Sequence, residues 1–411
     1  MGYELDVGAQ GRLLKYFAGI GEALANKKRR ESFAIYAMGL LGSADRKSAE
    51  PLAAAASAAP ETCDAYHQRL LHFLGNSPWS DRAVRREAAE YAIEAMTERE
   101  PMRTWIIDDT GFPKQGTHSV GVQRQYTGTT GKISNCQIGV SLSIATRSAH
   151  VPIDFELYLP ESWASDAARR SECKIPDEVV FRTKEDLALD MIVRAAEDKV
   201  PGDIILADSF YGRSYDFRET VRVLGFDYAL GISPTQTMWV LDGRERCSGD
   251  AKAARTIASE LGKKAFRRVT WRNGSMQGRR GKLNSRFALA RVKVAHDDGR
   301  EPERREPLWL LIEWPDGEAA PTKYALTTLP RTMSKKQLVR LFKERYRTER
   351  VYEEMKCELG LDHFEGRSFL GWHHHISVAI CCYAFVIAER MRHFPPTARR
   401  SSAARADSLA A

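Results

Sequence analysis

The first hundred residues carry apolar side chains at the three- and four-residue spacing of amphipathic helices, with polar residues between them. This pattern predicts five helices, over Gly11–Leu24, Ser32–Leu41, Ala49–Ala58, Cys63–Leu74 and Ser80–Met96. We therefore expect residues 1–100 to form a helical domain. The basic run Asn26–Arg30 leaves two interpretations open, a plain helical bundle or a DNA-contacting domain, because no clear helix-turn-helix is present.

From Met102 the hydrophobic pattern changes to short apolar runs of strand length. Three predicted strands (104–109, 137–146 and 151–160) precede an amphipathic helix at 184–199. A short apolar strand at 203–208, a helix at 213–225 and another strand at 227–233 follow. This order predicts an α/β fold with a mixed sheet.

Between about residues 235 and 322 the pattern alternates as antiparallel strands do, at 266–271, 287–296 and 308–314. The segment from Lys263 to Arg286 contains no acid and nine basic residues: Lys263, Lys264, Arg267, Arg268, Arg272, Arg279, Arg280, Lys282 and Arg286. Such a run is typical either of nucleic-acid contact or of an exposed hairpin with solvated charges, and we favour the former. Residues 323–330 are expected to return to the main sheet as a strand.

The segment from Ser334 to Gly360 predicts one long helix, because Ser334 can cap its start, Gly360 can end it and no proline interrupts it. At helical spacing, Phe342, Arg345, Glu349, Glu353 and Lys356 share one stripe. A solvated face of i, i+4 ion pairs is the simpler explanation of this stripe. An apolar helix at 371–394 follows, and residues 396–411 are expected to be a disordered tail. The predicted domain limits are 1–100, 101–234, 235–322, 323–395 and 396–411.

The bulk composition is that of an ordinary soluble protein with a mild basic excess. The chain has 411 residues, 43% of them hydrophobic, and a net charge of +8, which favours a polyanionic partner. Seven scattered cysteines without CxxC spacing indicate a reducing cytosol and argue against zinc fingers and disulfides. We expect no membrane span and no signal peptide.

Three acidic positions carry the candidate chemistry. Asp108 and Asp109 close one predicted strand and Asp208 closes another, at the strand ends where α/β sheets place ligands. Because strand side chains alternate, only one of the adjacent aspartates can face a given site. Any single aspartate there can be a simple turn cap. Together with an acid on the charged helix, however, they suit Mg²⁺ or Mn²⁺, and two such ions can promote phosphodiester displacement.

Three sequence blocks resemble the DDE transposases of bacterial insertion sequences, in the seven-hundred-and-one branch of the insertion-sequence-four superfamily. The blocks are IDDTGFPKQG, LADSFYG and RYRTERVYEEMKCELGLDHFEGRS followed by GWHHH. The family's helix signature of Tyr, Arg, Glu and Lys corresponds here to Phe342, Arg345, Glu349 and Lys356, with Phe in place of Tyr. The resemblance runs in blocks from about Met102 to Phe394 and is looser before them.

The resemblance implies a ribonuclease-H-like catalytic core with a β-rich insertion. It implies that Asp109, Asp208 and Glu349 bind the metal ions, with Glu353 as a reserve ligand. Arg345 and Lys356 would contact phosphates of the transposon end, Phe342 would lose any contact made by a tyrosine hydroxyl, and the basic insertion would handle the DNA end. Within it Trp271 can stack on an unpaired base, although a half-buried core position is the more usual place for a tryptophan.

The expected function is therefore cleavage and strand transfer of insertion-sequence ends by a protein that acts as a homodimer on double-stranded DNA, in the bacterial cytoplasm. Two alternatives stay open: a ribonuclease-H-like nuclease without strand transfer, and a domesticated DNA-binding regulator. His373, His374 and His375 are consecutive on a helix and cannot converge on one metal ion, so we expect them to pack or to meet the DNA backbone.

Overall fold

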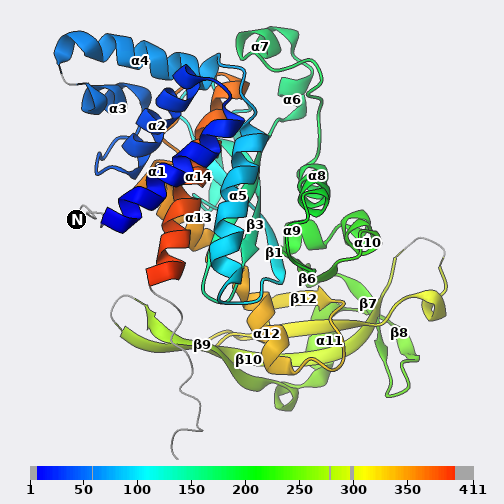
Figure 1. Ribbon diagram of the computed structural model, residues 1–411. Helices are drawn as coiled ribbons and strands as arrows, with labels where there is room; N and C mark the ends of the chain where they lie inside the picture. The colour runs from blue at the N-terminus through cyan, green and yellow to red at the C-terminus, as the bar shows by residue number, and fades with distance from the viewer. Residues whose placement is uncertain (1–6, 58, 277–278, 297–299, 394–411) are drawn as a thin grey trace, which may run out of the picture.

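The computed structural model describes residues 7–57, 59–276, 279–296 and 300–393 (Figure 1). All five helices expected in the first hundred residues are present, as α1 (Val7–Ala23), α2 (Lys27–Leu41), α3 (Ala49–Ala56), α4 (Pro60–Gly75) and α5 (Asp81–Thr97). The expected tail, 396–411, lies outside the described residues. Asn26 caps α2 by accepting a hydrogen bond from the backbone N–H of Arg29, so the basic run forms the first turn of that helix.

A mixed sheet forms the centre of the molecule. Its first part has the order β4–β3–β1–β5–β6, with β2 also pairing with β3. The strands are β1 (Thr104–Pro113), β2 (Gln123–Thr127), β3 (Lys132–Ala145), β4 (His150–Tyr158), β5 (Ile204–Ala207) and β6 (Asp227–Ile232). β1 pairs with β3 in antiparallel and with β5 in parallel orientation, and β5 pairs in parallel with β6. The α/β class with a mixed sheet is confirmed; β2 was not foreseen.

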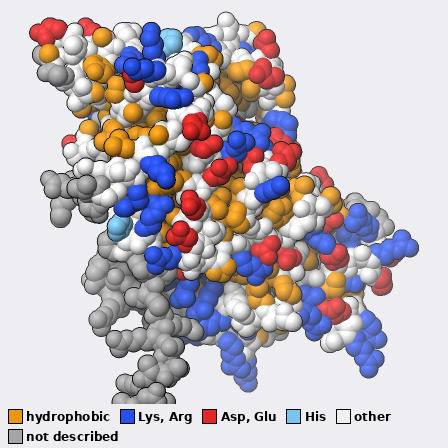
Figure 2. All heavy atoms as spheres, viewed as in Figure 1, with side chains coloured by type: hydrophobic (Ala, Val, Ile, Leu, Met, Phe, Trp, Pro, Cys, Tyr) orange, Lys and Arg blue, Asp and Glu red, His pale blue; other side chains and the backbone are white. Residues whose placement is uncertain are grey.

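The β-rich segment extends this sheet instead of forming a separate layer. Its strands continue from β6 in the order β12–β11–β10–β7–β8, with β9 pairing with β10. They are β7 (Thr237–Leu241), β8 (Cys247–Ala253), β9 (Arg267–Met276), β10 (Arg279–Val294), β11 (Leu308–Trp314) and β12 (Lys323–Thr327), with the helix α11 (Ala254–Leu261) between β8 and β9. β12 pairs with both β6 and β11, so the expected return to the main sheet is confirmed. In Figure 2, lysine and arginine side chains project from the lower part of the molecule, where this extension lies.

Helices cover both faces of the sheet. On one face α8 (Lys184–Glu197) packs on β3 and β4, and α10 (Tyr215–Val223) packs on β6. On the other face α12 (Lys335–Glu344) contributes Leu338 and Leu341 to an apolar cluster with Ile106 of β1 and Leu206 of β5. The even-numbered side chains at the start of β1 therefore face α12, and the odd-numbered ones face α8 and α10.

The helix expected from Ser334 to Gly360 is broken into two. Its ends are as predicted, because Ser334 forms a capping box with Gln337 and Gly360 closes the segment with φ of 62°. Between them, α12 ends at Glu344 and α13 spans Arg347–Leu359, and the N–H of Thr348 bonds to the carbonyl of Arg345, a tightened i to i−3 turn. The break lets α12 pack on the extension of the sheet while α13 crosses β1 and β4.

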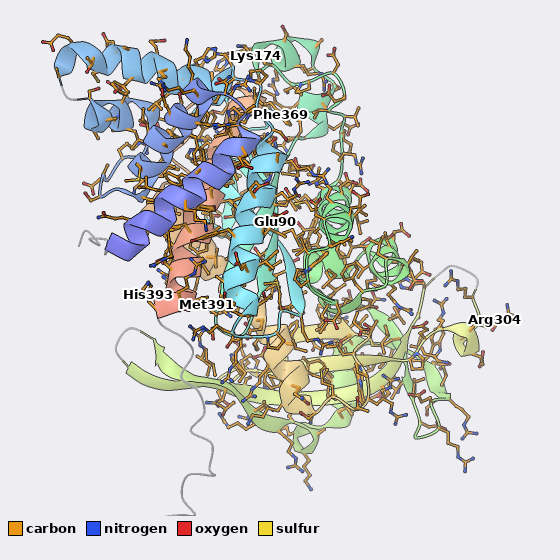
Figure 3. The ribbon with its side chains drawn as sticks, viewed as in Figure 1. Glu90, Lys174, Arg304, Phe369, Met391 and His393 are labelled. Carbon is orange, nitrogen blue, oxygen red and sulfur yellow. The ribbon has the colours of Figure 1, made fainter. Side chains whose placement is uncertain are left out.

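The last helix, α14 (Phe369–His393), packs mainly on α5 and β4 and also contacts α13. Figure 3 shows Phe369 at one end of this helix and Met391 and His393 at the other, so α14 runs the length of the N-terminal helices. By length and composition α14 could cross a membrane, contrary to our expectation that no segment would. However, 89% of its most apolar window is buried in the protein, as in a core helix.

The three consecutive histidines of α14 are packing residues. All three are buried. His374 bonds to the carbonyl oxygens of Leu74 and Trp79, and His375 bonds to the hydroxyl of Tyr36. His374 and His375 thus fasten α14 to the N-terminal helices, and His373 contacts Glu156 of β4. This confirms the packing interpretation and excludes the contact with a DNA backbone.

Candidate active site

Two adjacent aspartates, Asp108 and Asp109, lie beside Asp208, which follows the end of β5. The expectation that they close their strand is wrong, because β1 continues to Pro113 in its pairing with β3. The parallel register pairs Ile106 with Leu206. Continued by two residues, the same register places Asp108 next to Asp208. Asp208 directly follows the last residue of β5 and caps the short helix α9 (Ser209–Gly212). Apolar flanks bury the strand ends, so the parallel pairing forces the acids together.

Asp109 points toward α8. Its Oδ2 lies 3.0 Å from Nζ of Lys184, the first residue of α8, and the two side chains are 22% and 16% exposed. The Lys184 ammonium also lies 5.0 Å from the ring centre of Phe210 and 5.8 Å from that of Tyr158. Burial raises the pKa of Asp109; the charge of Lys184 opposes the rise, and that of Asp208 adds to it.

Asp108 points to the opposite side of the strand, toward the corner between α12 and α13. Its Oδ2 lies 3.2 Å from Nη1 of Arg345. Burial raises the pKa of Asp108 to about 7; the Arg345 guanidinium works against the rise, whereas the charges of Asp208 and Asp109 add to it. The adjacent aspartates thus separate to the two faces, as strand geometry requires, but both remain electrostatically coupled to Asp208.

Asp208 is held by the backbone of the helix that it caps. Its Oδ1 accepts hydrogen bonds from the N–H groups of Phe210 and Tyr211, at 2.8 and 3.4 Å. The α9 helix is pressed against β6, because a Cβ on Gly212 would lie 1.9 Å from the carbonyl oxygen of Gly231. The position of Asp208 is therefore fixed by backbone contacts on both sides.

Helix α13 carries Glu349 past β1. Nζ of Lys356 donates to Oγ1 of Thr110 at 2.9 Å and to the carbonyl of Gly111 at 2.7 Å. Arg345 and Lys356 thus hold the two ends of this segment against β1. Glu349 lies on the helix between them and is exposed. Both basic residues are engaged within the protein here, whereas we had expected them to contact phosphates.

The donor chemistry of the aspartates fits a hard divalent cation, because carboxylate oxygens are the ligands that Mg²⁺ and Mn²⁺ prefer. Buried like charges also need a compensating cation, and Lys184 and Arg345 supply it here. Among the described residues, no group of three or more His, Cys, Asp and Glu side chains is close enough to hold a metal ion. This holds for Asp108, Asp109 and Asp208, whose charges nevertheless act on one another, and also for Glu349 and the reserve Glu353.

The basic segment forms the long β9–β10 hairpin, which projects at the lower left of Figure 1. Arg267, Arg268 and Arg272 are exposed, and Arg268 pairs with Asp316 at 2.8 Å. The side chains of Arg279, Arg280 and Lys282 lie outside the described residues. The described arginines thus have the exposure that a nucleic-acid contact needs.

Two aromatic candidates from the sequence are partly buried instead of free. Phe342 packs against the apolar cluster of Val269, Phe287, Leu311, Ala325 and Val339, and so does Trp271. Trp271 lies at an irregularity of the β9–β10 pairing, and Nζ of Lys343 is 4.7 Å from its ring centre. Lys343 thus covers one face of the Trp271 ring, an arrangement that favours the half-buried core position over a stacking role.

A cavity of about 340 Å³ lies apart from the aspartates, between α5, β4 and α8. Behind it, the buried Arg85 pairs with Asp81 at 2.6 Å and with Asp154 at 3.1 Å, and Arg194 of α8 shares Asp154. This network joins the N-terminal helices to the sheet. Because the cavity's walls carry both charges and no residue of the aspartate cluster, we assign the network a structural role.

Sequence reasoning missed Lys184 and gave Asp108 no role. Asp108 was visible as half of an acidic pair. Lys184 had no signal beyond its place at the start of an amphipathic helix, because only the crossover from β4 to β5 brings α8 to Asp109.

Two comparisons agree with this arrangement. A family model described as DDE superfamily endonuclease matches residues 17–278, which include the N-terminal helices, Asp109 and Asp208 but not Glu349. The chain is 29% identical over 175 residues to a protein of Microchaete diplosiphon described as a probable transposase for insertion sequence element IS701. That alignment covers 42% of this chain and 43% of the relative, less than half of its length. Since the family model matches well over half of the chain, this protein belongs to the DDE superfamily endonucleases.

Proposed function

We propose that this protein is an insertion-sequence transposase that cleaves the ends of its element and joins them to target DNA. The observation that carries the proposal is the group of mutually repelling aspartates in β1 and directly after β5, of which Asp108 is buried, countered by Lys184 and Arg345. Such a cluster is costly to fold and is typical of a site that works with a cation. The relative described as a probable transposase supports the choice of substrate.

In this proposal the core is ribonuclease-H-like. Its support is the strand order β4–β3–β1–β5–β6, with three antiparallel strands followed by two parallel ones and a crossover helix before each. The parallel strands place the first two acids side by side, and the last helices supply the third. The β-rich extension inserted between β6 and α12 then lies along the DNA.

Asp109, Asp208 and Glu349 would hold two Mg²⁺ ions, for which Mn²⁺ can substitute. Bound there, the ions would activate a water or a 3′-hydroxyl and stabilise the leaving oxygen. Asp208 is pre-positioned by the N–H groups of α9. Glu349, exposed on α13 between residues that contact β1, would join when DNA and ions arrive.

In this proposal the basic side chains at the site have two roles in turn. Lys184 and Arg345 balance the acids before ions bind, and they become available to phosphate oxygens once the ions take over that role. The exposed arginines of β9 would contact the DNA backbone, and two protomers would bind the two ends of the element. Light scattering of the DNA complex tests this homodimer.

The test uses purified protein, Mg²⁺ and a labelled duplex carrying the repeats that flank the gene. Asp109→Asn, Asp208→Asn and Glu349→Gln should each abolish cleavage, retain DNA binding and weaken Mg²⁺ binding in calorimetry. Cleavage that survives all three substitutions would remove this assignment. Strand transfer of pre-cleaved ends into a plasmid separates a transposase from a nuclease, and binding without cleavage by the unaltered protein would favour a regulator.

A further inference from the structure

Tyr211 lies in the short helix α9, three residues after Asp208, and its side chain is buried, with 1% of the residue exposed. Its hydroxyl has no hydrogen-bond partner among the residues that the structure describes. A buried hydroxyl without a partner costs free energy, because it gives up its hydrogen bonds to water and gains none in the protein. A phenylalanine would fill the same space without this cost. The hydroxyl therefore needs an explanation beyond packing.

The ring of Tyr211 has a fixed place in the fold. Its centre lies 5.2 Å from that of the Phe210 ring, at an interplanar angle of 81°, and 5.6 Å from that of the Phe217 ring in α10. The backbone N–H of Tyr211 donates to Oδ1 of Asp208 at 3.4 Å. Since Gly212 packs α9 closely against β6, this turn cannot move further toward the sheet. The ring therefore determines where the hydroxyl lies.

The hydroxyl lies within electrostatic range of the aspartates of the candidate active site. Burial raises the pKa of Tyr211 well above its usual value, and the charges of the three aspartates add to the rise, that of Asp109 most strongly. The contacts of the ring agree with this position. Phe210, which meets the Tyr211 ring edge-on, lies with its ring centre 5.0 Å from Nζ of Lys184, and Lys184 pairs with Asp109.

Next to carboxylates, a tyrosine hydroxyl acts as a hydrogen-bond donor, because an ionised carboxylate only accepts. In this structure each of the three carboxylates is engaged elsewhere, with Lys184, with Arg345 or with backbone N–H groups of α9. The Tyr211 hydroxyl can gain a partner only when one of them leaves its present contact. In the proposed function Asp109 does so, because a divalent cation takes over the role of the Lys184 ammonium.

We propose that Tyr211 is a positioning residue of the ion site, whose hydroxyl donates a hydrogen bond to the carboxylate of Asp109 when that carboxylate turns from Lys184 to a divalent cation. This inference deepens the proposed function and rests on it. The bond would hold a ligand oxygen in its binding orientation, and the loss of such an outer partner typically lowers metal affinity about 10- to 100-fold.

The experiment uses the full chain and Tyr211→Phe, which removes the hydroxyl and keeps the ring. In EDTA this variant should unfold at the same urea concentration as the unaltered protein or at a higher one, because it loses no hydrogen bond and removes an unpaired buried group. In calorimetry it should bind Mg²⁺ about 10- to 100-fold more weakly. A purely structural hydroxyl predicts the opposite results, namely lower stability and unchanged Mg²⁺ affinity.

Tyr36→Phe is the matched control. Tyr36 is also 1% exposed, but its hydroxyl bonds to Nδ1 of His375 at 2.8 Å, between α2 and α14. This variant should unfold at a lower urea concentration, because it loses a buried hydrogen bond, and it should bind Mg²⁺ as the unaltered protein does.

Asp208→Asn, measured in the same calorimetry, separates failure of this inference from failure of the proposed function. Equal Mg²⁺ affinity of Tyr211→Phe and the unaltered protein, or easier unfolding of Tyr211→Phe in EDTA, would overturn the role of Tyr211. The proposed ion site would then stand if Asp208→Asn weakens Mg²⁺ binding. If Asp208→Asn leaves the affinity unchanged, or if the unaltered protein binds no Mg²⁺, both proposals fall.

Discussion

Without bound metal ions at pH 8, the ionised Asp108 should destabilise the folded protein. Its neutral isostere, asparagine, should therefore make the protein more stable. Its pKa lies at about 7 in the folded protein, against an ordinary value of 3.8. The difference of about three pH units, at about 1.4 kcal/mol each, means that the ionised carboxylate costs the folded state about 4 kcal/mol. Asp108→Asn removes this cost but weakens the bond to Arg345, a loss of about 2 kcal/mol. We therefore expect the variant to be more stable by about 2 kcal/mol at pH 8.

The pH dependence of this contribution to stability is opposite to that of an ordinary paired carboxylate. Because the folded protein binds the proton more tightly than the unfolded chain does, the contribution of Asp108 to stability is fully present below pH 4 and is lost as the pH rises through 7. The advantage of Asp108→Asn should therefore be gone at pH 4.5, where the lost bond to Arg345 outweighs the small remaining cost of ionisation.

Urea unfolding followed by tryptophan fluorescence at the two pH values, in EDTA, measures the difference. Asp203→Asn, which removes an exposed ion pair with Arg103, is the matched control and should change the free energy of unfolding by less than about 1 kcal/mol. A destabilising effect of Asp108→Asn at pH 8, or an effect that does not depend on pH, would refute the argument that buried like charges strain this site.

Three further outcomes are expected. Lys184→Met should lower the free energy of unfolding by about 3 kcal/mol at pH 8, because it leaves Asp109 without its cation. The loss should be smaller at lower pH, because burial already raises the pKa of Asp109 and Lys184 is the charge that opposes this rise. An equal loss at pH 8 and pH 5 in urea unfolding would contradict this. Gly212→Ala should cost about 3 kcal/mol or more, because its Cβ would meet the backbone of Gly231, whereas Gly243→Ala, with open space around it, should be tolerated; thermal melting of the pair decides. Millimolar Mg²⁺ should raise the melting temperature of the unaltered protein and raise that of Asp208→Asn less, as calorimetry can check.

The sequence by itself determined the elements and their order. Hydrophobic periodicity placed the five N-terminal helices and the strands of the core, since burial of one face imposes a period of 3.6 or 2 on the chain. It also determined that Asp108 and Asp109 must face opposite sides, because alternation is a property of any strand. The two ends of the helical segment from Ser334 to Gly360 could also be predicted, because these residues cap a helix through local contacts that do not depend on tertiary packing.

Only the tertiary structure decided which of these residues meet. The helix breaks at Arg345 because α12 and α13 pack on different parts of the sheet, which no local sequence pattern encodes. The break separates Phe342 from the helix face that carries Glu349. The ion pair between Lys184 and Asp109 spans 75 positions and arises from a crossover connection. Pairing of β2 with β3, in turn, brings Thr129 of the connecting turn to Lys356, while Trp271 is packed against Phe287. Long-range pairing of strands sets these contacts, because it brings together residues that are far apart in the sequence.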